Sequence, residues 1–245
     1  MYIKFFNEIS KEDINLVGGK GASLGEMTQA GFSVPLGFVI TTEALGQINE
    51  KEIFKALDLL NAEKVSVRSS AVAEDSSKAS WAGQLETYLN VSREELINKI
   101  KDCWNSIKSE RVKTYAARQN LSEDQLLMAV VIQKMVDVKV AGVMFTANPV
   151  TNNEEEIMIE SVLGLGEQLV QGSVTPDNFV VDKESGEINS KDLRGEQTID
   201  DEVVKKLVEL GKKIEGYFGS PQDIEWAIDK QDKIWILQSR PITTL

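Results

Sequence analysis

Residues 64–90 read KVSVRSSAVAEDSSKASWAGQLETYLN, and this stretch contains the pattern that decides the fold. A short strand brings Arg68 to a loop of small polar residues, and a second strand begins after Gly83. Arginine carries a permanent charge on a planar fork, and backbone N–H groups can approach an oxyanion closely beside side chains as small as those of Ser80 and Ala82. The stretch therefore predicts either a phosphate-binding loop or an ordinary surface connection, and the pattern alone leaves both open.

The composition excludes several classes of protein. The chain has 245 residues, of which 42% are hydrophobic and 27% charged, and no apolar run is long enough to cross a bilayer. A net charge of −12 would repel a nucleic acid unless basic residues were concentrated on one surface, and no such cluster is visible. The first residues do not resemble a secretory signal. We therefore expect a cytoplasmic globular protein that binds neither nucleic acid nor membrane.

The chain contains no histidine and one cysteine. Histidine is the usual general base, the commonest transition-metal ligand and the residue that forms phosphohistidine, so none of these roles can be filled within the chain. A zinc site is not expected either. Cys103 lies near Trp104 and Ile107 at helical spacing, which predicts a packing role. Any metal should be a hard cation bound by oxygen, with Mg²⁺ the first choice.

Hydrophobic periodicity predicts a mixture of helices and strands. Helices are expected over residues 20–30, 42–60, 92–119 and 203–218. Strands are expected over residues 37–42, 65–68, 85–91, 128–135, 140–146, 156–161, 178–182, 187–190, 223–228 and 233–239. The strands at 128–135 and 140–146 are expected to pair as a hairpin. The mixture indicates an α+β fold of two packed lobes, which we place approximately at residues 1–125 and 126–245.

The last predicted hairpin, DIEWAIDKQDKIWILQSRP, gathers polar side chains. Period-two alternation puts Asp223 and Glu225 on one face of its first strand. If the turn centres on residues 231–232, Glu225 lies opposite Gln238 and Asp223 lies opposite Arg240, with Cβ atoms about 5 Å apart. Oxygens of Glu225 and Gln238 would suit Mg²⁺, and Arg240 could take a phosphate beside the metal. The alternative is a surface hairpin in which Asp223 simply pairs with Arg240.

Three further features give weaker signals. VGGKG could present Lys20 to phosphate or leave it solvated near a helix start, and the segment does not match the P-loop spacing. GLGEQL, around Gly164 and Gly166, does not fit the Rossmann fingerprint and predicts a tight helix entry. Glu160, at the end of the preceding strand, is either an acid that faces a ligand or a partner in a structural pair.

Five segments together resemble the ATP-grasp nucleotide-binding region of the phosphoenolpyruvate synthase, pyruvate phosphate dikinase and rifampin phosphotransferase superfamily. They are LVGGKGASLGEMTQAGFSVPLGFVITTEA, VSVRSSAVAEDSSKASWAGQLETYLNV, VAGVMFTANPVT, IESVLGLGEQLVQGSVTPDNFVV, and DIEWAID with WILQSRPIT. The match runs nearly end to end in this order. The SWAGQLETYLNV form is more similar to the synthase and rifampin enzymes than to the dikinase. The resemblance implies an ATP-grasp-like fold with an ATP cleft between its two lobes.

The resemblance also implies roles for charged residues. Lys20, Arg68 and Arg240 would contact ATP phosphates and serve catalysis. Glu225 and Gln238 would hold Mg²⁺. The other acids expected to face the nucleotide are Asp223 and Glu160.

A further set follows from the resemblance around the phosphates and the base. The loop from Ser80 to Gln84, which includes Gly83, would close over the phosphates. Gln133 and Met135 would lie at the adenine end of the cleft, where backbone groups typically read the base. Thr87 would be a polar support nearby.

In this superfamily the ATP domain transfers a phosphoryl group to a histidine on a separate swivelling domain. In the synthase and rifampin enzymes the resemblance implies that ATP goes to AMP and phosphate. Such a site needs cations and a metal for electrostatic positioning, and it needs no nucleophile of its own. The missing histidine then indicates the ATP-binding part of such an enzyme, which requires a histidine-bearing phosphocarrier domain as its partner. The final acceptor, pyruvate or an antibiotic, is not indicated.

The chain departs from the superfamily pattern in two ways. About twenty residues connect the strand ending near Thr42 with the strand leading to Arg68, where the superfamily has a longer segment. The N-terminal lobe is therefore expected to be shortened, and the acceptor domain is absent from the chain. These departures favour the alternative of a degenerate nucleotide-binding or interaction module without phosphotransfer activity. The retained cations and metal ligands favour a catalytic module.

Overall fold

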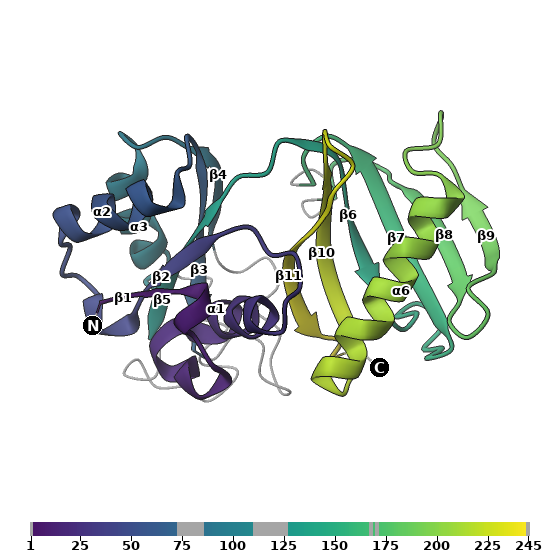
Figure 1. Ribbon diagram of the computed structural model, residues 1–245, viewed down its shortest axis with the longest axis horizontal. Helices are drawn as coiled ribbons and strands as arrows, with labels where there is room; N and C mark the ends of the chain where they lie inside the picture. The colour runs from purple at the N-terminus through teal and green to yellow at the C-terminus, as the bar shows by residue number, and fades with distance from the viewer. Residues whose placement is uncertain (1, 73–85, 110–126, 167–168, 170–171, 244–245) are drawn as a thin grey trace. The chain divides into compact units, whose positions relative to one another are not determined.

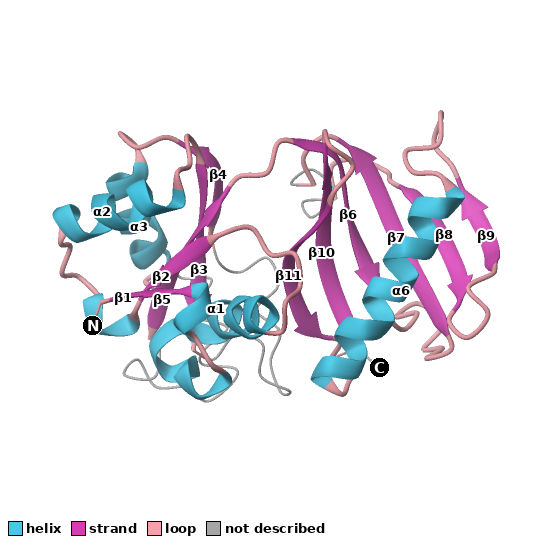
Figure 2. Cartoon of the chain, in the orientation of Figure 1, coloured by secondary structure: helices cyan, strands magenta, loops and turns pink. Residues whose placement is uncertain are grey.

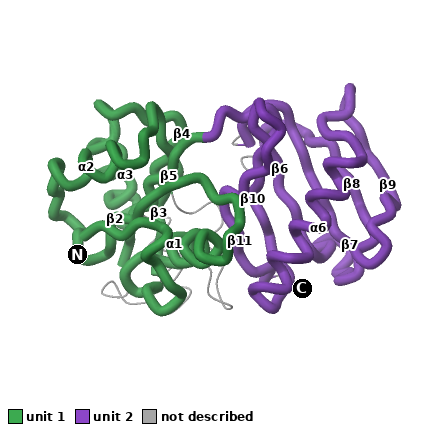
Figure 3. Tube along the Cα trace, viewed as in Figure 1, with its two compact units in different colours: residues 1–135 green, residues 136–245 purple. Residues whose placement is uncertain are grey.

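The chain forms two compact units, Met1–Met135 and Val136–Leu245 (Figure 3). The computed structural model describes residues 2–72, 86–109, 127–166, 169 and 172–243. Among these residues each unit is built around its own sheet. The lobe boundary expected at residues 125 and 126 precedes strand β5 (Met128–Lys134), and the structure assigns that strand to the first unit.

In the described part of the first unit, five strands follow the order β1-β2-β5-β3-β4 (Figure 1). The other four are β1 (Ile3–Phe5), β2 (Gly37–Ile40), β3 (Val65–Ala71) and β4 (Thr87–Val91). The α-helices are α1 (Ile14–Gln29), α2 (Glu50–Leu60) and α3 (Leu96–Ser106). Short 3-10 turns lie at Phe6–Glu8, Lys11–Asp13 and Thr42–Ala44.

The two faces of this sheet pack against different helices. One face contributes Phe38, Val67 and Ile132 to the apolar core, which α2 and α3 complete. Cys103 of α3 lies in this core, as its helical spacing predicts, and burial raises the pKa of its thiol to about 11. Helix α1 covers the other face, where a Cβ added at Gly21 would lie 3.2 Å from Val39. Arg68 belongs to this second face, because side chains alternate along β3.

Strand β5 does not pair with β6 (Val138–Phe145), so the predicted hairpin is wrong. β5 lies between β2 and β3, with Gln133 opposite Gly37 and Ser66. The apolar run of β5 is buried over six of its seven residues. A central strand needs a partner along each edge. The hairpin was predicted because the two strands follow each other in the sequence, and this closeness did not identify the partners of β5.

Three helices begin or end at residues that differ from the predicted bounds. α1 begins before residue 20 and is interrupted at Gly18, whose φ of 70° is not helical. Residues 42–60 form a 3-10 turn followed by α2, because Asn49 caps the helix by accepting a hydrogen bond from the N–H of Glu52. α3 ends at Ser106, and residues 110–119 of the predicted helix lie outside the described residues. No helix in the described ranges is both long and apolar enough to span a membrane.

In the described part of the second unit, six antiparallel strands follow the order β11-β10-β6-β7-β8-β9. The strands besides β6 are β7 (Glu156–Leu163), β8 (Asp177–Asp182), β9 (Ile188–Asp192), β10 (Gln222–Asp229) and β11 (Ile234–Pro241). Helix α6 (Asp201–Phe218) lies across one face of this sheet (Figure 2). Its contact with β6 is close, because a Cβ added at Gly211 would lie 2.9 Å from Met144.

Asp177, the first residue of β8, anchors the loop that follows β9. Its side chain is buried, and its carboxylate accepts hydrogen bonds from the backbone N–H groups of Arg194 at 2.7 Å and Thr198 at 2.9 Å. Burial alone would raise the pKa of Asp177. The two hydrogen bonds and the charge of Arg194 outweigh burial, so the pKa lies below its ordinary value.

Asp177→Asn should lower the free energy of unfolding by about 3 kcal/mol at pH 7, because an amide cannot accept from both N–H groups. The folded-state pKa of Asp177 is depressed, so its stabilisation is present above the ordinary value of 3.8 and is lost as the pH falls through the lowered value. Denaturant unfolding across pH should show the two proteins converging in acid.

The matched control is Asp192→Asn, which removes an exposed ion pair with Arg194. It should change the free energy of unfolding by less than about 1 kcal/mol. A deficit in Asp177→Asn that stayed constant down to the acid limit would contradict the assignment.

Candidate functional site

The β10–β11 hairpin has the pairing that the sequence predicts. Glu225 lies opposite Gln238, and Asp223 lies opposite Arg240. The same rung of the sheet continues through Val143 of β6 to Glu160 of β7. Directly opposed residues in antiparallel strands share a face. The acids, the amide and the arginine expected to bind ligands in this unit therefore lie on one face of one sheet.

The predicted turn of this hairpin is wrong, although the predicted pairs are correct. The backbone N–H of Asp229 donates to the carbonyl of Lys233, which leaves a three-residue loop in place of two residues. Asp232 in this loop has a φ of 61°, as a three-residue hairpin loop requires. A register shift after Glu225 leaves Leu237 as an extra residue and restores the predicted pairs. The extra residue in the loop and the extra residue at Leu237 offset each other, so Glu225 and Asp223 have the predicted partners.

The carboxylate of Asp229 explains why the loop has three residues. It accepts hydrogen bonds from the backbone N–H groups of Gln231 and Lys233 and from Nε1 of Trp235. An aspartate that binds its own following backbone favours such a turn.

Helix α6 covers the opposite face from these polar residues. Met144 lies opposite Ile224 in the sheet and packs against Gly211 of the helix. Asp223 and Glu225 flank Ile224 and therefore point to the other face. Among the described helices of this unit, none occupies that face. No described helix of the second unit therefore covers the polar rung.

Asp223 and Arg240 form a partly buried ion pair. Nε of Arg240 lies 2.8 Å and Nη2 lies 2.6 Å from Oδ2 of Asp223. Burial raises the pKa of Asp223, the charge of Arg240 opposes this rise, and the nearby Glu225 adds to it. The pair expected in the surface-hairpin alternative is therefore present, and it holds the guanidinium beside the carboxylates.

Glu160 is half-buried and its pKa is raised. Loss of hydration is the largest cause, and the charge of Asp223 adds to it. Nδ2 of Asn178 lies 3.5 Å from Oε1 of Glu160 and partly offsets the rise. Asn178 was not predicted from the sequence. Alternation along NFVV places it on the same face as Val180. Only the register between β7 and β8 places it opposite Glu160.

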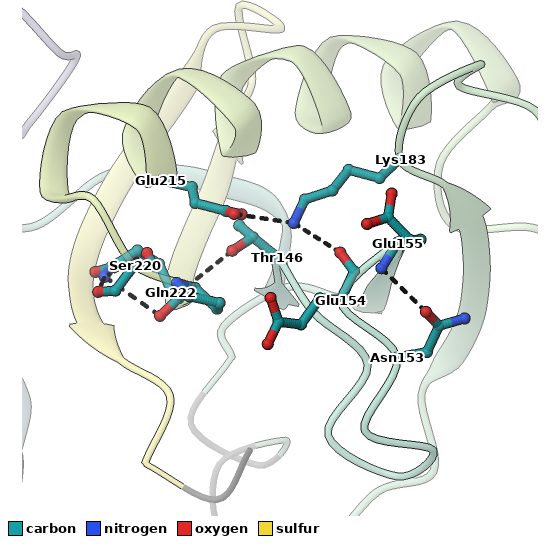
Figure 4. Close-up of polar contacts among 9 residues, drawn as sticks. Thr146, Asn153, Glu154, Glu155, Lys183, Glu215, Ser220 and Gln222 are labelled. Carbon is teal, nitrogen blue, oxygen red and sulfur yellow. Dashed lines mark hydrogen bonds and ion pairs between the residues drawn. The ribbon is translucent and has the colours of Figure 1, made fainter.

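A second polar network anchors the start of β10 (Figure 4). The backbone N–H of Gln222 donates to Oγ1 of Thr146 at 2.8 Å, and Oγ of Ser239 donates to Oε1 of Gln222 at 2.9 Å. Gln222 is buried and directly precedes Asp223. Nearby, Nζ of Lys183 donates to the carbonyl of Glu154 and to Oε1 of Glu215, both at 2.9 Å, which ties α6 to the loop before β7. The ends of β6, β10 and β11 are fixed together beside Asp223 and Arg240.

The first unit gathers a separate set of predicted residues. Arg68 lies opposite Thr87 and Val131, and Gln133 lies two residues from Val131, so these side chains share the face that α1 covers. Lys20 of α1 is 5% exposed, and its Nζ donates to the carbonyl of Ser69 at 2.9 Å. The structure therefore brings Lys20, Arg68, Thr87 and Gln133 to one side of the sheet.

The other residues predicted to bind the nucleotide in the first unit are Met135, Ser80, Gly83 and Gln84. Met135 follows β5, and its backbone N–H donates to the carbonyl of Lys64 at 3.1 Å. Ser80, Gly83 and Gln84 lie outside the described residues. In the described part of the chain, Nε2 of Gln133 is buried without a hydrogen-bond partner. A buried donor without a partner is costly and is often completed by a ligand or water.

A dedicated metal cage is absent from the described residues, because no three histidine, cysteine, aspartate or glutamate side chains converge. Glu225 and Gln238 supply oxygen donors, which are the ligands of hard cations. Mg²⁺ is commonly bound through one or two carboxylates together with substrate phosphates, and the residues present fit that mode.

The comparison with protein families identifies the chain. Residues 14–58, 47–197 and 189–245 match the pyruvate phosphate dikinase, AMP/ATP-binding domain family. The chain belongs to this family. It is a nucleotide-binding module of the dikinase type, as the sequence motifs indicate.

Curated members related to this dikinase-family chain are longer proteins. Phosphoenolpyruvate synthase of Pyrococcus furiosus is 36% identical, over 100% of this chain and 44% of that protein. The uncharacterized phosphotransferase YvkC of Bacillus subtilis is 36% identical, over 100% of this chain and 35% of that protein. The chain spans less than half the length of each.

A solved structure supports the ATP-grasp-like fold of this family member. N5-carboxyaminoimidazole ribonucleotide synthetase, solved as an ADP complex, gives a TM-score of 0.50 at 11% identity, over 91% of this chain and 45% of that chain. At this identity the similarity concerns the fold. The α+β, ATP-grasp-like expectation is confirmed.

The alignments with relatives contain positions that this chain lacks. An alignment of 358 positions with the Pyrococcus protein contains all 245 residues of this chain and leaves 113 positions without a counterpart here. The family match is divided at residues 47–58, within the connection expected to be short, and again at residues 189–197. Helix α2 supplies 11 residues of that connection, and its Ile53, Leu57 and Leu60 are buried in the core. The short connection therefore contributes to the core of the first unit.

Glu160→Gln should raise the free energy of unfolding at neutral pH, because burial penalises the charged carboxylate and the amide carries no charge. The folded-state pKa is raised, so protonation favours the folded wild-type protein at low pH and this advantage is lost as the pH rises through the folded-state value. Unfolding curves from about pH 4, near the ordinary pKa of glutamate, to about pH 8 should show the advantage of the variant growing with pH. Equal stability at all pH values would refute the desolvated carboxylate.

Proposed function

We propose that this chain is an ATP- and Mg²⁺-binding module that transfers a phosphoryl group to a histidine on a separate domain or chain. This would be the first half-reaction of an enzyme like phosphoenolpyruvate synthase or rifampin phosphotransferase. The observation that carries the proposal is the rung in which Glu225 lies opposite Gln238, with Asp223 opposite Arg240 on the same face. It supplies oxygen donors for a hard cation next to a guanidinium suited to phosphate.

In the first unit, Lys20 and Arg68 are the proposed phosphate contacts. Both belong to the side of the sheet that α1 covers, with Lys20 bonded to the carbonyl that follows Arg68. Ammonium and guanidinium groups stabilise the charge that spreads over phosphate oxygens during transfer. The loop from Ser80 to Gln84 remains the proposed cover for the phosphates.

The proposed adenine end lies along β5. Gln133 has a buried Nε2 that could be satisfied by a nucleotide, and it lies on the same face as Arg68. Thr87, opposite Arg68, is the proposed polar support, and Met135 lies beyond the end of the strand. Glu160 and Asp223 are the proposed acids near the nucleotide.

Mg²⁺ would be held by the oxygens of Glu225 and Gln238. When bound, it would neutralise negative charge on the phosphates. Asp223 holds Arg240 in place through the hydrogen bonds to Nε and Nη2. The guanidinium is thereby oriented before any phosphate arrives, which lowers the cost of ordering it on binding.

The acceptor of the phosphoryl group must be supplied from elsewhere, because the chain contains no histidine. In the proposed reaction the bond between the α- and β-phosphoryl groups of ATP breaks and AMP leaves. The β-phosphoryl group joins a histidine nitrogen of the partner. The bond between the β- and γ-phosphoryl groups also breaks, and water adds to the γ-phosphoryl group to give inorganic phosphate. The partner is thus a histidine-bearing phosphocarrier domain.

A second candidate is a degenerate nucleotide-binding or interaction module without phosphotransfer. The positions that this chain lacks relative to the Pyrococcus protein favour it. The core around α2 favours the catalytic proposal, because Ile53, Leu57 and Leu60 of the short connection are buried in it.

Arg240→Ala and Glu225→Ala should each weaken binding of ATP with Mg²⁺ by roughly tenfold or more, because each removes a charge-assisted contact worth about 1.5–3 kcal/mol. Isothermal titration calorimetry measures the dissociation constants directly. Arg194→Ala is the matched control, since Arg194 is an exposed arginine of the same unit whose ion pair is with Asp192. Unchanged affinity in both site variants would remove the assignment.

Phosphotransfer is tested with ATP labelled at the β- or γ-phosphorus and a histidine-bearing carrier domain added as a separate polypeptide. The β-label should appear on the carrier and the γ-label in inorganic phosphate. Binding without any label on the carrier would favour the degenerate module.

A further inference from the structure

Ser70 connects strand β3 to the glycine-rich turn of α1. Its side chain is fully buried. Its Oγ donates to the carbonyl of Val17 at 2.7 Å and accepts a hydrogen bond from the backbone N–H of Gly21 at 3.1 Å. A single hydroxyl therefore uses its donor and an acceptor position on two points of the same turn.

The turn lies directly against Ser70. Gly18 has a φ of 70°, which interrupts α1, and a Cβ added there would lie 2.3 Å from the carbonyl oxygen of Ser70. No side chain fits in that space without displacing the strand or the turn. The backbone from Val17 to Gly21 is therefore fixed on β3 by close contact as well as by hydrogen bonds.

Lys20 lies between the two points that Ser70 binds. Its Nζ donates to the carbonyl of Ser69, the residue before Ser70, at 2.9 Å. A lysine side chain has four rotatable bonds and loses much rotamer freedom when it is ordered. Fixing its backbone on both sides in the free protein removes part of that cost from ligand binding.

We infer that Ser70 is a positioning residue, which acts through Lys20 by setting the backbone that carries it toward an anionic ligand. The inference rests on the proposed function, since it assumes that Lys20 contacts the phosphates of ATP. It goes beyond that function because it assigns a role in ligand binding to a buried hydroxyl that does not itself contact the ligand.

The test is a double-mutant cycle between Ser70→Ala and Lys20→Met, with the dissociation constant of ATP in the presence of Mg²⁺ as the readout. Ser70→Ala should weaken binding by about tenfold, as expected for the loss of a buried hydrogen-bonded hydroxyl that preorganises a ligand contact. In the Lys20→Met background the same change should have no further effect. A merely structural role for Ser70 would weaken binding equally in both backgrounds.

Ser106→Ala is the matched control. Its hydroxyl also donates to a backbone carbonyl at 2.7 Å, that of Cys103, but it lies in α3 on the other side of the sheet. It should change the dissociation constant by less than about twofold, in line with surface and distant substitutions that add independently. All titrations are made below the unfolding transition of every variant. If Ser70→Ala does not fold, Ser70→Cys keeps a side chain of similar shape with a weaker donor and acceptor, and it should show the same coupling to Lys20.

The outcomes separate the two proposals. If Lys20→Met weakens binding but Ser70→Ala has no effect, or has an effect that adds independently, the inference about Ser70 is overturned while the proposed function stands. If Lys20→Met leaves binding unchanged, the assignment of Lys20 in the proposed function fails, and the role of Ser70 fails with it.

Discussion

The constraint on which the first unit depends is a completely buried strand that carries polar residues. All seven residues of β3 are buried, including Ser66, Arg68 and Ser70. Buried polar groups must be paired, because an unpaired group costs several kcal/mol, of order 1–3 in proteins. The turn of α1 meets this requirement at Ser70, and it can do so only because Gly18 has no side chain. The same requirement brings Lys20 to the strand that holds Arg68.

In the second unit, the register of the sheet separates polar side chains from apolar ones. Antiparallel pairing sorts side chains by parity, so Asp223 and Glu225 are separated from Ile224 by the pleat. The apolar residues bind α6, while the carboxylates share a face with Gln238 and Arg240. The pKa values of Asp223 and Glu160 are raised chiefly by loss of hydration, so this face has a cost in stability. Desolvated acids beside a fixed guanidinium are typical of sites that bind ligands.

Much of this arrangement could be predicted from the sequence, because alternation is a local property. The parity of Asp223 and Glu225 and their partners on β11 were correct, although the turn was wrong and a bulge at Leu237 compensated for it. The partners of β5 could not be predicted, because a continuous apolar run does not say which strands lie beside it. Ser70 and Asn178 were missed for a related reason. Their roles depend on residues 49 positions away at Gly21 and 18 positions away at Glu160.

The central claim is that the polar residues predicted in each unit contact ATP. Amide hydrogen exchange with and without ATP and Mg²⁺ tests it most directly, because protection is read separately for each segment. The account predicts slower exchange both in the turn of α1 with β3 and in β10 with β11. Slower exchange in only one unit, or no change in either, would contradict it.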